Sequence, residues 1–363
     1  MKILHYVDEN RLAWGETWIQ LIKELSRKQI QNYVVCKSGG TLAGRLKEEN
    51  LPFEIFDIPI SWLPQTGTKF RKIIAEFSPD VIHTRLSSAA RIAGYWGKRA
   101  GIPVVQTVDK FPKAHYHKNA AFLLTCSESV KSYMEGLGFP ANKITTIFNP
   151  VDSKLYSFDS IEAENTRNKL GILPDEKIIL GAGRFVDWKG FDNLIKAYKL
   201  LLDNSQQNVK LLLLGDGEEK SKLCGLIRSL GIEKNVIMPG FVQDIRPYLW
   251  ASDIFVLPSK EPEPFGIVLI EAMASGLASV ATKAGGPIDI IEEGINGCLA
   301  EIDSCKDIAD KLKILLDDEN YRIRIAKTGM DTVVNKFSVE EIANRHVEIY
   351  SKFEKYRKKT GQN

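Results

Sequence analysis

The sequence of 363 residues lacks several features that would assign it to common classes of protein. No run of about 18 uncharged apolar residues occurs, which excludes a membrane-spanning helix. The five cysteines are scattered and never spaced as C-x-x-C, so neither a disulfide framework nor a zinc site is indicated. Only five residues separate Lys2 from Asp8, too few for the apolar region of a signal peptide. These absences predict a cytoplasmic protein.

Several nucleotide-binding and hydrolase motifs are also missing. The absence of G-x-x-x-x-G-K-[ST] excludes a P-loop ATPase or kinase, and the absence of G-x-S-x-G argues against a standard serine hydrolase. Residues 181–183 begin like a dinucleotide-binding fingerprint, but Val186 occupies the place of its third glycine. Asp216 and Glu218 form an acidic pair that we interpret as a strand-to-helix turn, so no metal is expected.

The net charge of +3 is unevenly distributed. Residues 1–150 carry 20 Lys and Arg against 13 Asp and Glu, whereas residues 151–351 carry 24 against 32. Residues 352–363 carry five against one. A basic first half and tail favour an anionic membrane surface or a phosphorylated substrate, although solvated surface charge explains the same pattern. No basic run is interleaved with aromatic residues, so no nucleic-acid partner is expected.

What the sequence does contain is a regular alternation of short apolar runs and helical patterns. Strands are predicted in the first half at residues 3–7, 33–36, 81–84, 103–107 and 122–126, and in the second at residues 178–181, 209–214, 236–238, 254–257 and 279–281. Helical spacing separates them at residues 16–30, 69–77, 89–100, 191–202, 218–230 and 267–275. Strands that alternate with helices predict α/β domains with parallel sheets covered on both faces.

The length of the chain exceeds what one hydrophobic core usually supports, so two domains are predicted. We place the linker at residues 148–158, where an Asn-Pro pair interrupts the periodic pattern. The first domain then covers residues 1–150 and the second residues 151–338, with a final amphipathic helix at about 339–358 that packs back on the first domain. Two doubly wound domains form a cleft, and such sheets bind ligands outside the carboxyl ends of their strands.

The sharpest signal is the segment SKEPEPFGIVLIEAMASG at residues 259–276. Glu263 lies in a loop after a predicted strand, and Glu271 is the only charged residue of an apolar helix. A buried, unpaired carboxylate costs several kcal/mol, so Glu271 must find a partner or point into a polar cleft. A surface position is the alternative, but this helix has no other polar face. The amino end of the same helix suits an anion.

A second signal is the pair Arg184 and Lys189, which flank a turn between a strand and a helix. A planar guanidinium and a compact ammonium are the pair expected around a diphosphate, although two solvated loop cations would look the same. In the first half, Gly15 precedes a helix and would let the backbone approach a phosphate. Asp109 follows a predicted strand and is a candidate acceptor-side base or hydrogen-bond partner, or else a turn residue.

Together these residues resemble the retaining glycosyltransferase family 4 (glycosyl transferases group 1), which has the GT-B fold of two Rossmann-like domains facing across a cleft. The second-half motifs that carry the resemblance are Arg184, Lys189-Gly190, Gly215, Glu263-Pro264-Phe265-Gly266 and Glu271-Ala272-Met273-Ala274 with Gly276. The resemblance covers nearly the whole chain and is looser in the first half.

The resemblance implies roles for individual residues. Arg184 and Lys189 would hold the donor diphosphate, and Glu271 would bind the ribose hydroxyls. Glu263 would contact the transferred sugar. The remaining implied donor contacts are the backbone of Phe265, Gly266 and Ile267 near sugar or phosphate, Phe241 and Val242 near the base, and Gly15 closing on the diphosphate.

One departure from the family pattern leaves the acceptor side open. Many relatives have a histidine where this chain has Asp109, in the sequence TVDK. Asp109 could take over that role, His115 or His117 could substitute although both are expected on the surface, or the acceptor could differ from the common ones.

The resemblance implies a glycosyltransferase that uses a UDP- or GDP-linked sugar, needs no metal and retains anomeric configuration. Its acceptor would be a saccharide, either lipid-linked or part of a lipopolysaccharide core or another cell-envelope glycan. The basic first half and tail suit peripheral association with the inner face of the cytoplasmic membrane. A nucleotide-sugar epimerase of the same fold and an inert nucleotide-sugar-binding subunit are the alternatives.

Overall fold

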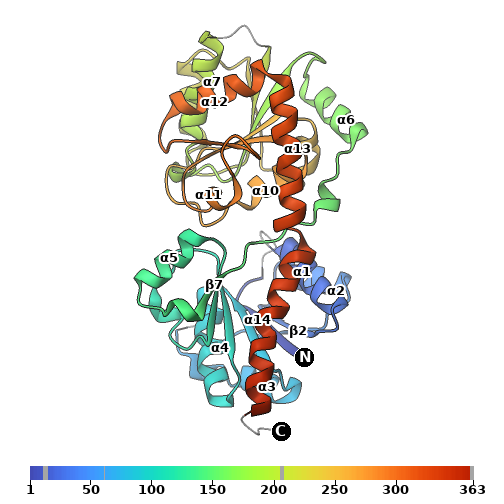
Figure 1. The fold of residues 1–363 in the computed structure, drawn as a ribbon, viewed down its shortest axis with the longest axis vertical. Helices are drawn as coiled ribbons and strands as arrows, with labels where there is room; N and C mark the ends of the chain where they lie inside the picture. Colours follow the sequence, from blue (N-terminus) through green and yellow to red (C-terminus); the bar gives the residue numbers. More distant parts are fainter. Residues whose placement is uncertain (11–14, 61, 205–207, 360–363) are drawn as a thin grey trace. The chain divides into compact units, whose positions relative to one another are not determined.

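The computed structural model describes residues 1–10, 15–60, 62–204 and 208–359 (Figure 1). The chain divides into two units, one comprising Met1–Pro150 together with Ser338–Asn363, and the other comprising Val151–Phe337. The last helix, α14 (Val339–Lys359), therefore belongs to the same unit as the amino end of the chain. Each unit is an α/β domain built on its own sheet, as the alternating pattern predicts.

The first unit contains seven parallel strands in the order β3-β2-β1-β4-β5-β6-β7. The strands are β1 (Lys2–Val7), β2 (Gln31–Cys36), β3 (Phe53–Ile55), β4 (Val81–Arg85), β5 (Val104–Val108), β6 (Phe122–Thr125) and β7 (Ile144–Thr146). The helices, besides α14, are α1 (Gly15–Arg27), α2 (Leu42–Glu48), α3 (Thr68–Phe77), α4 (Ser87–Ala100) and α5 (Glu128–Gly136). The sequence analysis misses β3 and β7, because three residues are too few to establish a periodic pattern.

Helices cover both faces of this sheet because successive residues of a strand point to opposite sides. Tyr6 of β1 packs in one hydrophobic cluster with Phe70 of α3 and Ile92 of α4. Ile3 of the same strand lies in the opposite cluster, which Leu21 of α1 and Tyr350 of α14 also enter. The final helix therefore closes part of the core of the first unit.

The second unit contains six parallel strands in the order β10-β9-β8-β11-β12-β13. They are β8 (Lys177–Ala182), β9 (Val209–Leu214), β10 (Val236–Gly240), β11 (Ile254–Leu257), β12 (Ala278–Thr282) and β13 (Cys298–Ala300). The helices are α6 (Ser160–Leu170), α7 (Phe191–Asn204), α8 (Lys220–Ser229), α9 (Arg246–Trp250), α10 (Ile267–Ala274), α11 (Pro287–Ile290), α12 (Cys305–Asp317) and α13 (Glu319–Lys336). Among the described residues, no helix combines the length and the apolar character needed to cross a bilayer.

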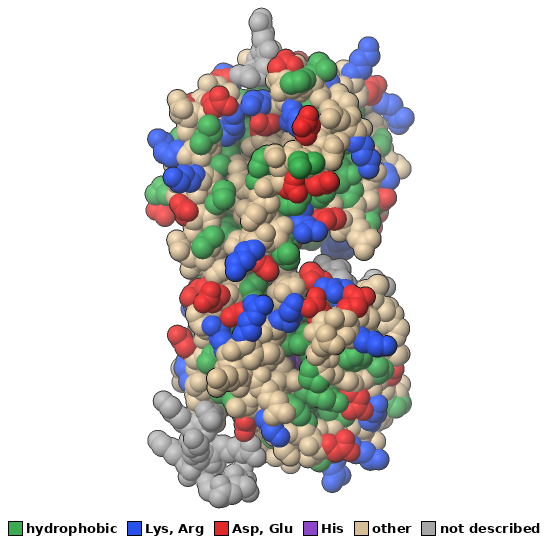
Figure 2. Space-filling model, turned by 90° about the vertical axis from the view of Figure 1, so that its right-hand side faces the viewer, with side chains coloured by type: hydrophobic (Ala, Val, Ile, Leu, Met, Phe, Trp, Pro, Cys, Tyr) green, Lys and Arg blue, Asp and Glu red, His purple; other side chains and the backbone are tan. Residues whose placement is uncertain are grey.

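The surface shown in Figure 2 carries charged side chains of both signs, interspersed over each unit.

Local side-chain caps fix several helix starts: the Asp159 carboxylate accepts from two backbone N–H groups of α6, and Ser304 and Asp318 cap α12 and α13. Such caps are worth about 1 kcal/mol each, so these helix boundaries are encoded locally.

Three histidines lie buried between the sheet of the first unit and α14. The ring of His83 lies 5.7 Å from that of His5 and 5.5 Å from that of His346, measured between centroids. The Tyr350 hydroxyl lies 2.5 Å from His83 Nδ1, and the Thr107 hydroxyl lies 2.7 Å from His83 Nε2. Burial is the main cause that lowers the pKa of His5 and of His346 to about 4, and it holds the pKa of His83 well below its usual value.

A fourth buried imidazole, His117, lies apart from this cluster. Its Nδ1 donates to Gln106 Oε1 at 2.8 Å, and burial lowers its pKa to about 4. The expectation that His115 and His117 both lie on the surface is therefore wrong for His117. His115 is exposed, as expected.

Acid should destabilise this protein between pH 6.5 and about 4. Below pH 6.5 these histidines become protonated in the unfolded chain, whereas in the folded chain they become protonated only near pH 4. The free energy of unfolding therefore falls as the pH falls. Each such histidine contributes about 1.4 kcal/mol per pH unit. His117→Gln should reduce this slope by roughly that amount, as measured by urea unfolding at several pH values.

His115→Gln is the matched control, because it replaces an exposed histidine two residues away in the same loop. Its slope should equal that of the wild type. An unchanged slope in His117→Gln would show that the buried imidazole does not stay neutral in the folded protein.

Candidate functional site

Both sheets change winding direction at one point, between β1 and β4 in the first unit and between β8 and β11 in the second. Loops that follow such neighbouring strands diverge to opposite faces and leave a crevice at the carboxyl edge of the sheet. In the second unit the loops after β8, β11 and β12 carry Arg184, Glu263 and Gly285. Residues that are distant in the sequence therefore meet at this edge.

The centre of the arrangement is an ion pair between Lys189 and Glu263. Lys189 ends the short helix η5 (Asp187–Lys189), and its Nζ lies 2.5 Å from Glu263 Oε2. The hydroxyl of Ser259 donates to the same carboxylate oxygen at 3.0 Å. The two charged side chains are only 13% and 9% exposed. Lys189, predicted to hold a diphosphate, and Glu263, predicted to contact a sugar, thus form one buried ion pair.

Backbone contacts hold these loops against one another. The Glu263 N–H donates to the Ala284 carbonyl at 2.8 Å, and the Glu263 carbonyl accepts from Gly286 N–H at 2.8 Å. A Cβ on Gly286 would lie 2.4 Å from Phe265 Cα, and one on Gly190 would lie 2.0 Å from the Pro258 carbonyl oxygen. Only glycine permits approaches this close.

Glu271 finds a partner within the second unit. The hydroxyl of Tyr156, in the short helix η4 (Ser153–Tyr156), donates to Glu271 Oε1 at 2.7 Å. Burial raises the pKa of Glu271, and the hydrogen bond from Tyr156 opposes that shift. The same burial, together with the Glu271 charge, raises the pKa of the Tyr156 phenol. The prediction that this carboxylate needs a partner or a polar cleft is met by a tyrosine that the sequence analysis did not identify.

Arg184 differs from Lys189 in being free. It is exposed, and within the part of the chain that the structure describes its guanidinium makes no hydrogen bond or ion pair. A free guanidinium at the carboxyl edge of a sheet can accept an anion without first breaking an internal contact.

The other predicted donor contacts take different positions in the second unit. The ring of Phe265 is buried against Phe337, with ring centroids 5.8 Å apart, so only its backbone can approach a ligand. Gly266 precedes α10 with φ of +109°, and Ile267 begins that helix. Phe241 is 77% exposed after β10, beside the half-buried Val242. An exposed aromatic ring offers a base a stacking surface.

In the first unit, Gly15 is the first residue of α1, after β1, and residues 11–14 lie outside the described part. Asp109 directly follows β5, and both its oxygens accept from Arg85, at 3.0 and 2.8 Å. The same guanidinium donates to Asn149 Oδ1 at 2.6 Å. Sequence reasoning missed Arg85, although its place at the end of β4 could have suggested it. Asp109 is therefore not a free base but one half of an ion pair.

The acidic pair after β9 forms a turn, as predicted. Asp216 is exposed, accepts from the Gly217 N–H at 2.8 Å and from Lys220 Nζ at 2.9 Å. Across the described ranges, no three His, Cys, Asp or Glu side chains are grouped as they would be around a metal ion.

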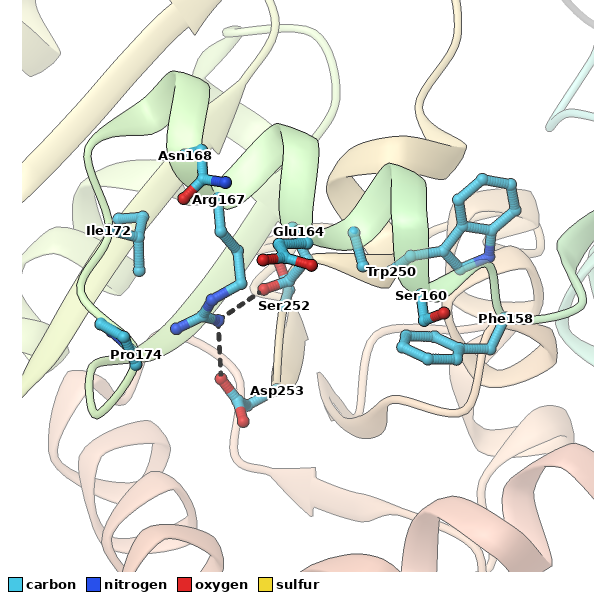
Figure 3. Close-up of a pocket in the computed structure, with 12 residues that line it drawn as sticks. Phe158, Ser160, Glu164, Arg167, Asn168, Ile172, Pro174, Trp250, Ser252 and Asp253 are labelled. Carbon is cyan, nitrogen blue, oxygen red and sulfur yellow. Dashed lines mark hydrogen bonds and ion pairs between the residues drawn. The ribbon is translucent and has the colours of Figure 1, made fainter.

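A separate pocket lies at the opposite end of the second sheet, before β11 (Figure 3). Its volume is about 480 Å³. Arg167 points into its wall and donates to the Ala251 carbonyl at 2.9 Å, with Asp253 at 3.9 Å. These contacts satisfy the guanidinium internally. None of the predicted donor residues lines this pocket.

Two family models match the chain in succession. Glycosyltransferase Family 4 matches residues 15–155, and Glycosyl transferases group 1 matches residues 162–331. Among curated proteins, the chain is similar to the lipopolysaccharide core biosynthesis glycosyltransferase LpsE of Rhizobium meliloti, with 26% identity over 96% of this chain and 98% of that protein.

It is also similar to a Campylobacter jejuni enzyme, the N,N'-diacetylbacillosaminyl-diphospho-undecaprenol alpha-1,3-N-acetylgalactosaminyltransferase. Their identity is 26% over 92% of this chain and 85% of that protein. Among solved structures, HepE of Anabaena in complex with UDP superposes with a TM-score of 0.86, at 24% identity, over 97% of this chain and 100% of that chain. That likeness establishes the fold.

Breaking the buried ion pair should destabilise the second unit. Lys189→Met leaves the Glu263 carboxylate buried without its cation and should cost roughly 3 kcal/mol in the free energy of unfolding. The double variant Lys189→Met with Glu263→Gln removes both charges and should recover much of that loss. Urea unfolding of the four proteins of this double-mutant cycle measures the coupling.

Lys196→Met is the control, because the ion pair of Lys196 with Asp192 is far more exposed and should cost less than about 1 kcal/mol. Strictly additive losses at Lys189 and Glu263 would contradict the buried pair.

Proposed function

The chain belongs to the glycosyl transferases group 1 family and is a glycosyltransferase of the GT-B fold, and from this premise we propose its reaction. It moves a sugar from a nucleoside diphosphate sugar to a saccharide acceptor with retention of anomeric configuration. The observation that carries the proposal is the edge of the second sheet. The loops after β8 and β11 carry an exposed Arg184 and the Lys189–Glu263 ion pair, and the following helix α10 carries Glu271, which Tyr156 holds.

The donor would bind through its diphosphate at Arg184 and Lys189. As the bond from the anomeric carbon to the diphosphate breaks, negative charge grows on the leaving oxygens, and fixed cations stabilise it without a metal ion. Glu271, held by Tyr156 at 2.7 Å, would accept hydrogen bonds from the ribose hydroxyls. Phe241 would stack near the base.

Glu263 would orient the sugar rather than attack it. Its carboxylate is paired with Lys189 and also accepts from Ser259, so it is a poor covalent nucleophile. We infer that the acceptor hydroxyl attacks from the face that the diphosphate leaves. The new carbon–oxygen bond forms as the old one breaks, and the hydroxyl proton passes to the departing phosphate oxygen.

The acceptor would be a cell-envelope saccharide. The Rhizobium meliloti relative, which the match covers over 98% of its length, is named for lipopolysaccharide core biosynthesis. The name of the Campylobacter jejuni relative includes diphospho-undecaprenol. The basic first half of the chain suits such acceptors, which lie at the inner surface of the cytoplasmic membrane. Peripheral attachment there is part of this proposal.

A nucleotide should stabilise the wild type, and Arg184→Ala should weaken that effect. UDP is the first ligand to test, with GDP and ADP beside it, because a solved neighbour of the same fold contains UDP. At about 100 times its dissociation constant a ligand adds roughly 2.7 kcal/mol, which thermal unfolding detects as a shift of a few degrees. Loss of a charge-assisted contact should reduce affinity about tenfold or more.

Arg228→Ala is the matched control, since Arg228 is also an exposed arginine of the second unit but lies in the last turn of α8. The shift should persist in Arg228→Ala and in the presence of EDTA. If none of the three nucleotides shifts the wild type, the proposed function is wrong. If EDTA removes the shift, donor binding requires a metal ion.

The product should keep the anomeric configuration of the donor. With an α-linked nucleotide sugar and a suitable saccharide acceptor, the new linkage should be α, and proton NMR coupling at the anomeric position reads it directly. A β-linked product would refute retention while leaving the transferase activity intact.

A further inference from the structure

One region of the first unit carries positive charge that no described residue of the unit neutralises. Residues 86–121 contain six cations, namely Arg91, Lys98, Arg99, Lys110, Lys113 and Lys118, and one carboxylate, Asp109. Asp109 already pairs with Arg85. Within the described residues none of the six cations forms an ion pair, whereas most lysines of the second unit do. Unpaired cations repel one another, so this concentration favours an anionic ligand.

Four of these cations belong to the loop between β5 and β6 and to the adjoining part of α4. Lys110, Lys113 and Lys118 lie in the loop that starts at Asp109, directly after β5, and Arg91 lies in the first half of α4. All three lysines are exposed. Lys98 and Arg99 lie instead in the last turn of α4, at the opposite end of the sheet. The loop cations therefore begin at Lys110, next to the strand end at which the acceptor-side residue is expected, and continue with Lys113 and Lys118 along α4.

The loop holds its lysines in fixed places because its middle is anchored in the core. The buried His117 donates to Gln106 Oε1 at 2.8 Å, and Gln106 Nε2 donates to the Ala90 carbonyl of α4 at 3.0 Å. The short helix η2 (Ala114–Tyr116) lies just before this anchor, between Lys113 and Lys118. A fixed loop loses less entropy when it binds a ligand.

Arg91 joins this loop to a second one. Its guanidinium lies 4.7 Å from the centre of the Tyr116 ring and 3.2 Å from His115 Nε2. It also donates to the Trp62 carbonyl at 3.2 Å, in the loop that follows β3. The side chain of Trp62 is 69% exposed. The backbone of Trp62 is thus bound to Arg91, and its large exposed ring offers a surface for the apolar face of a sugar, while the cations of this region offer one for a charged substituent.

We propose that this surface, formed by Trp62, Arg91, Lys113, Tyr116 and Lys118, binds a phosphate- or carboxylate-bearing part of the acceptor saccharide. The inference rests on the proposed function and deepens it by assigning the acceptor to the anionic saccharides. The lysines bind the charged substituent, and Trp62 packs on an adjacent sugar ring. Arg91 positions both loops and adds its own charge.

A discrete ligand explains these features better than a membrane surface does. Attraction to an anionic bilayer needs only diffuse positive charge and no fixed geometry. Here the cations sit on a loop anchored by a buried histidine, next to a stacked guanidinium and directly after Asp109. Such a fixed arrangement is what recognition of a single phosphate or carboxylate requires.

The test compares two probes that differ only in phosphate. One is the deacylated core oligosaccharide of a rough lipopolysaccharide, and the other is the same oligosaccharide after chemical dephosphorylation. Isothermal titration calorimetry measures both with the wild type, with Lys113→Gln/Lys118→Gln and with the control Lys98→Gln/Arg99→Gln. The control removes two cations from the other end of α4 in the same unit.

We expect the wild type to prefer the phosphorylated probe, and the preference to shrink as salt rises from about 50 to about 500 mM. Lys113→Gln/Lys118→Gln should lose about fivefold to tenfold of that preference, and the control should keep it. No preference in the wild type, or an equal loss in both variants, would overturn the inference.

Two further measurements separate the alternatives. Sedimentation with phosphatidylglycerol vesicles tests the membrane: if Lys113→Gln/Lys118→Gln loses vesicle binding but keeps its preference for the phosphorylated probe, the surface binds lipid and the inference fails. Thermal shifts with UDP, GDP and ADP test the donor site in all three proteins. A normal nucleotide shift without probe preference refutes only the inference, whereas absence of any nucleotide shift refutes the proposed function.

Discussion

The buried ion pair between Lys189 and Glu263 depends on one constraint, the parallel pairing of β8 with β11. Ile254 of β11 lies opposite Ile179 of β8, and Val256 lies opposite Gly181, so both strands end at the same edge. Their loops then bring together residues 74 positions apart in the sequence. Without that register the two charges would be buried separately, at a cost of several kcal/mol each. Most other features of the site follow from the same loop contacts.

Burial decides how each charged group of the second unit can act. The charges of Lys189 and Glu263 neutralise each other, whereas Glu271, in an apolar helix, accepts a hydrogen bond from the hydroxyl of Tyr156. Arg184 is the exception, exposed and without an internal partner among the described residues. A site built in this way has one unpaired cation, one cation held in an ion pair, and two carboxylates already oriented. Orientation before binding is what lets a fixed electrostatic environment accelerate a reaction.

The first unit also contains both charged side chains that form ion pairs and charged side chains that form none among the described residues. Arg85 holds both oxygens of Asp109, so the strand end itself is neutral. Among the described residues the cations of the following loop form no ion pair, and a buried histidine anchors that loop through Gln106 to β5 and α4. The last helix, α14, covers His5 and His83 and adds its own His346 to this buried cluster. A helix distant in sequence thus completes the core of the first unit.

The sequence by itself determined the α/β class, the longer strands and helices, and the residues at the strand ends of the second unit. Period-two and period-3.6 patterns are local, and an isolated carboxylate such as Glu271 in an apolar helix is visible without a structure. Only the tertiary structure decided the partners: Tyr156 for Glu271, Lys189 for Glu263, Arg85 for Asp109 and the burial of His117. Each of these contacts joins different elements, and strand order and register, which no local pattern encodes, determine which elements meet.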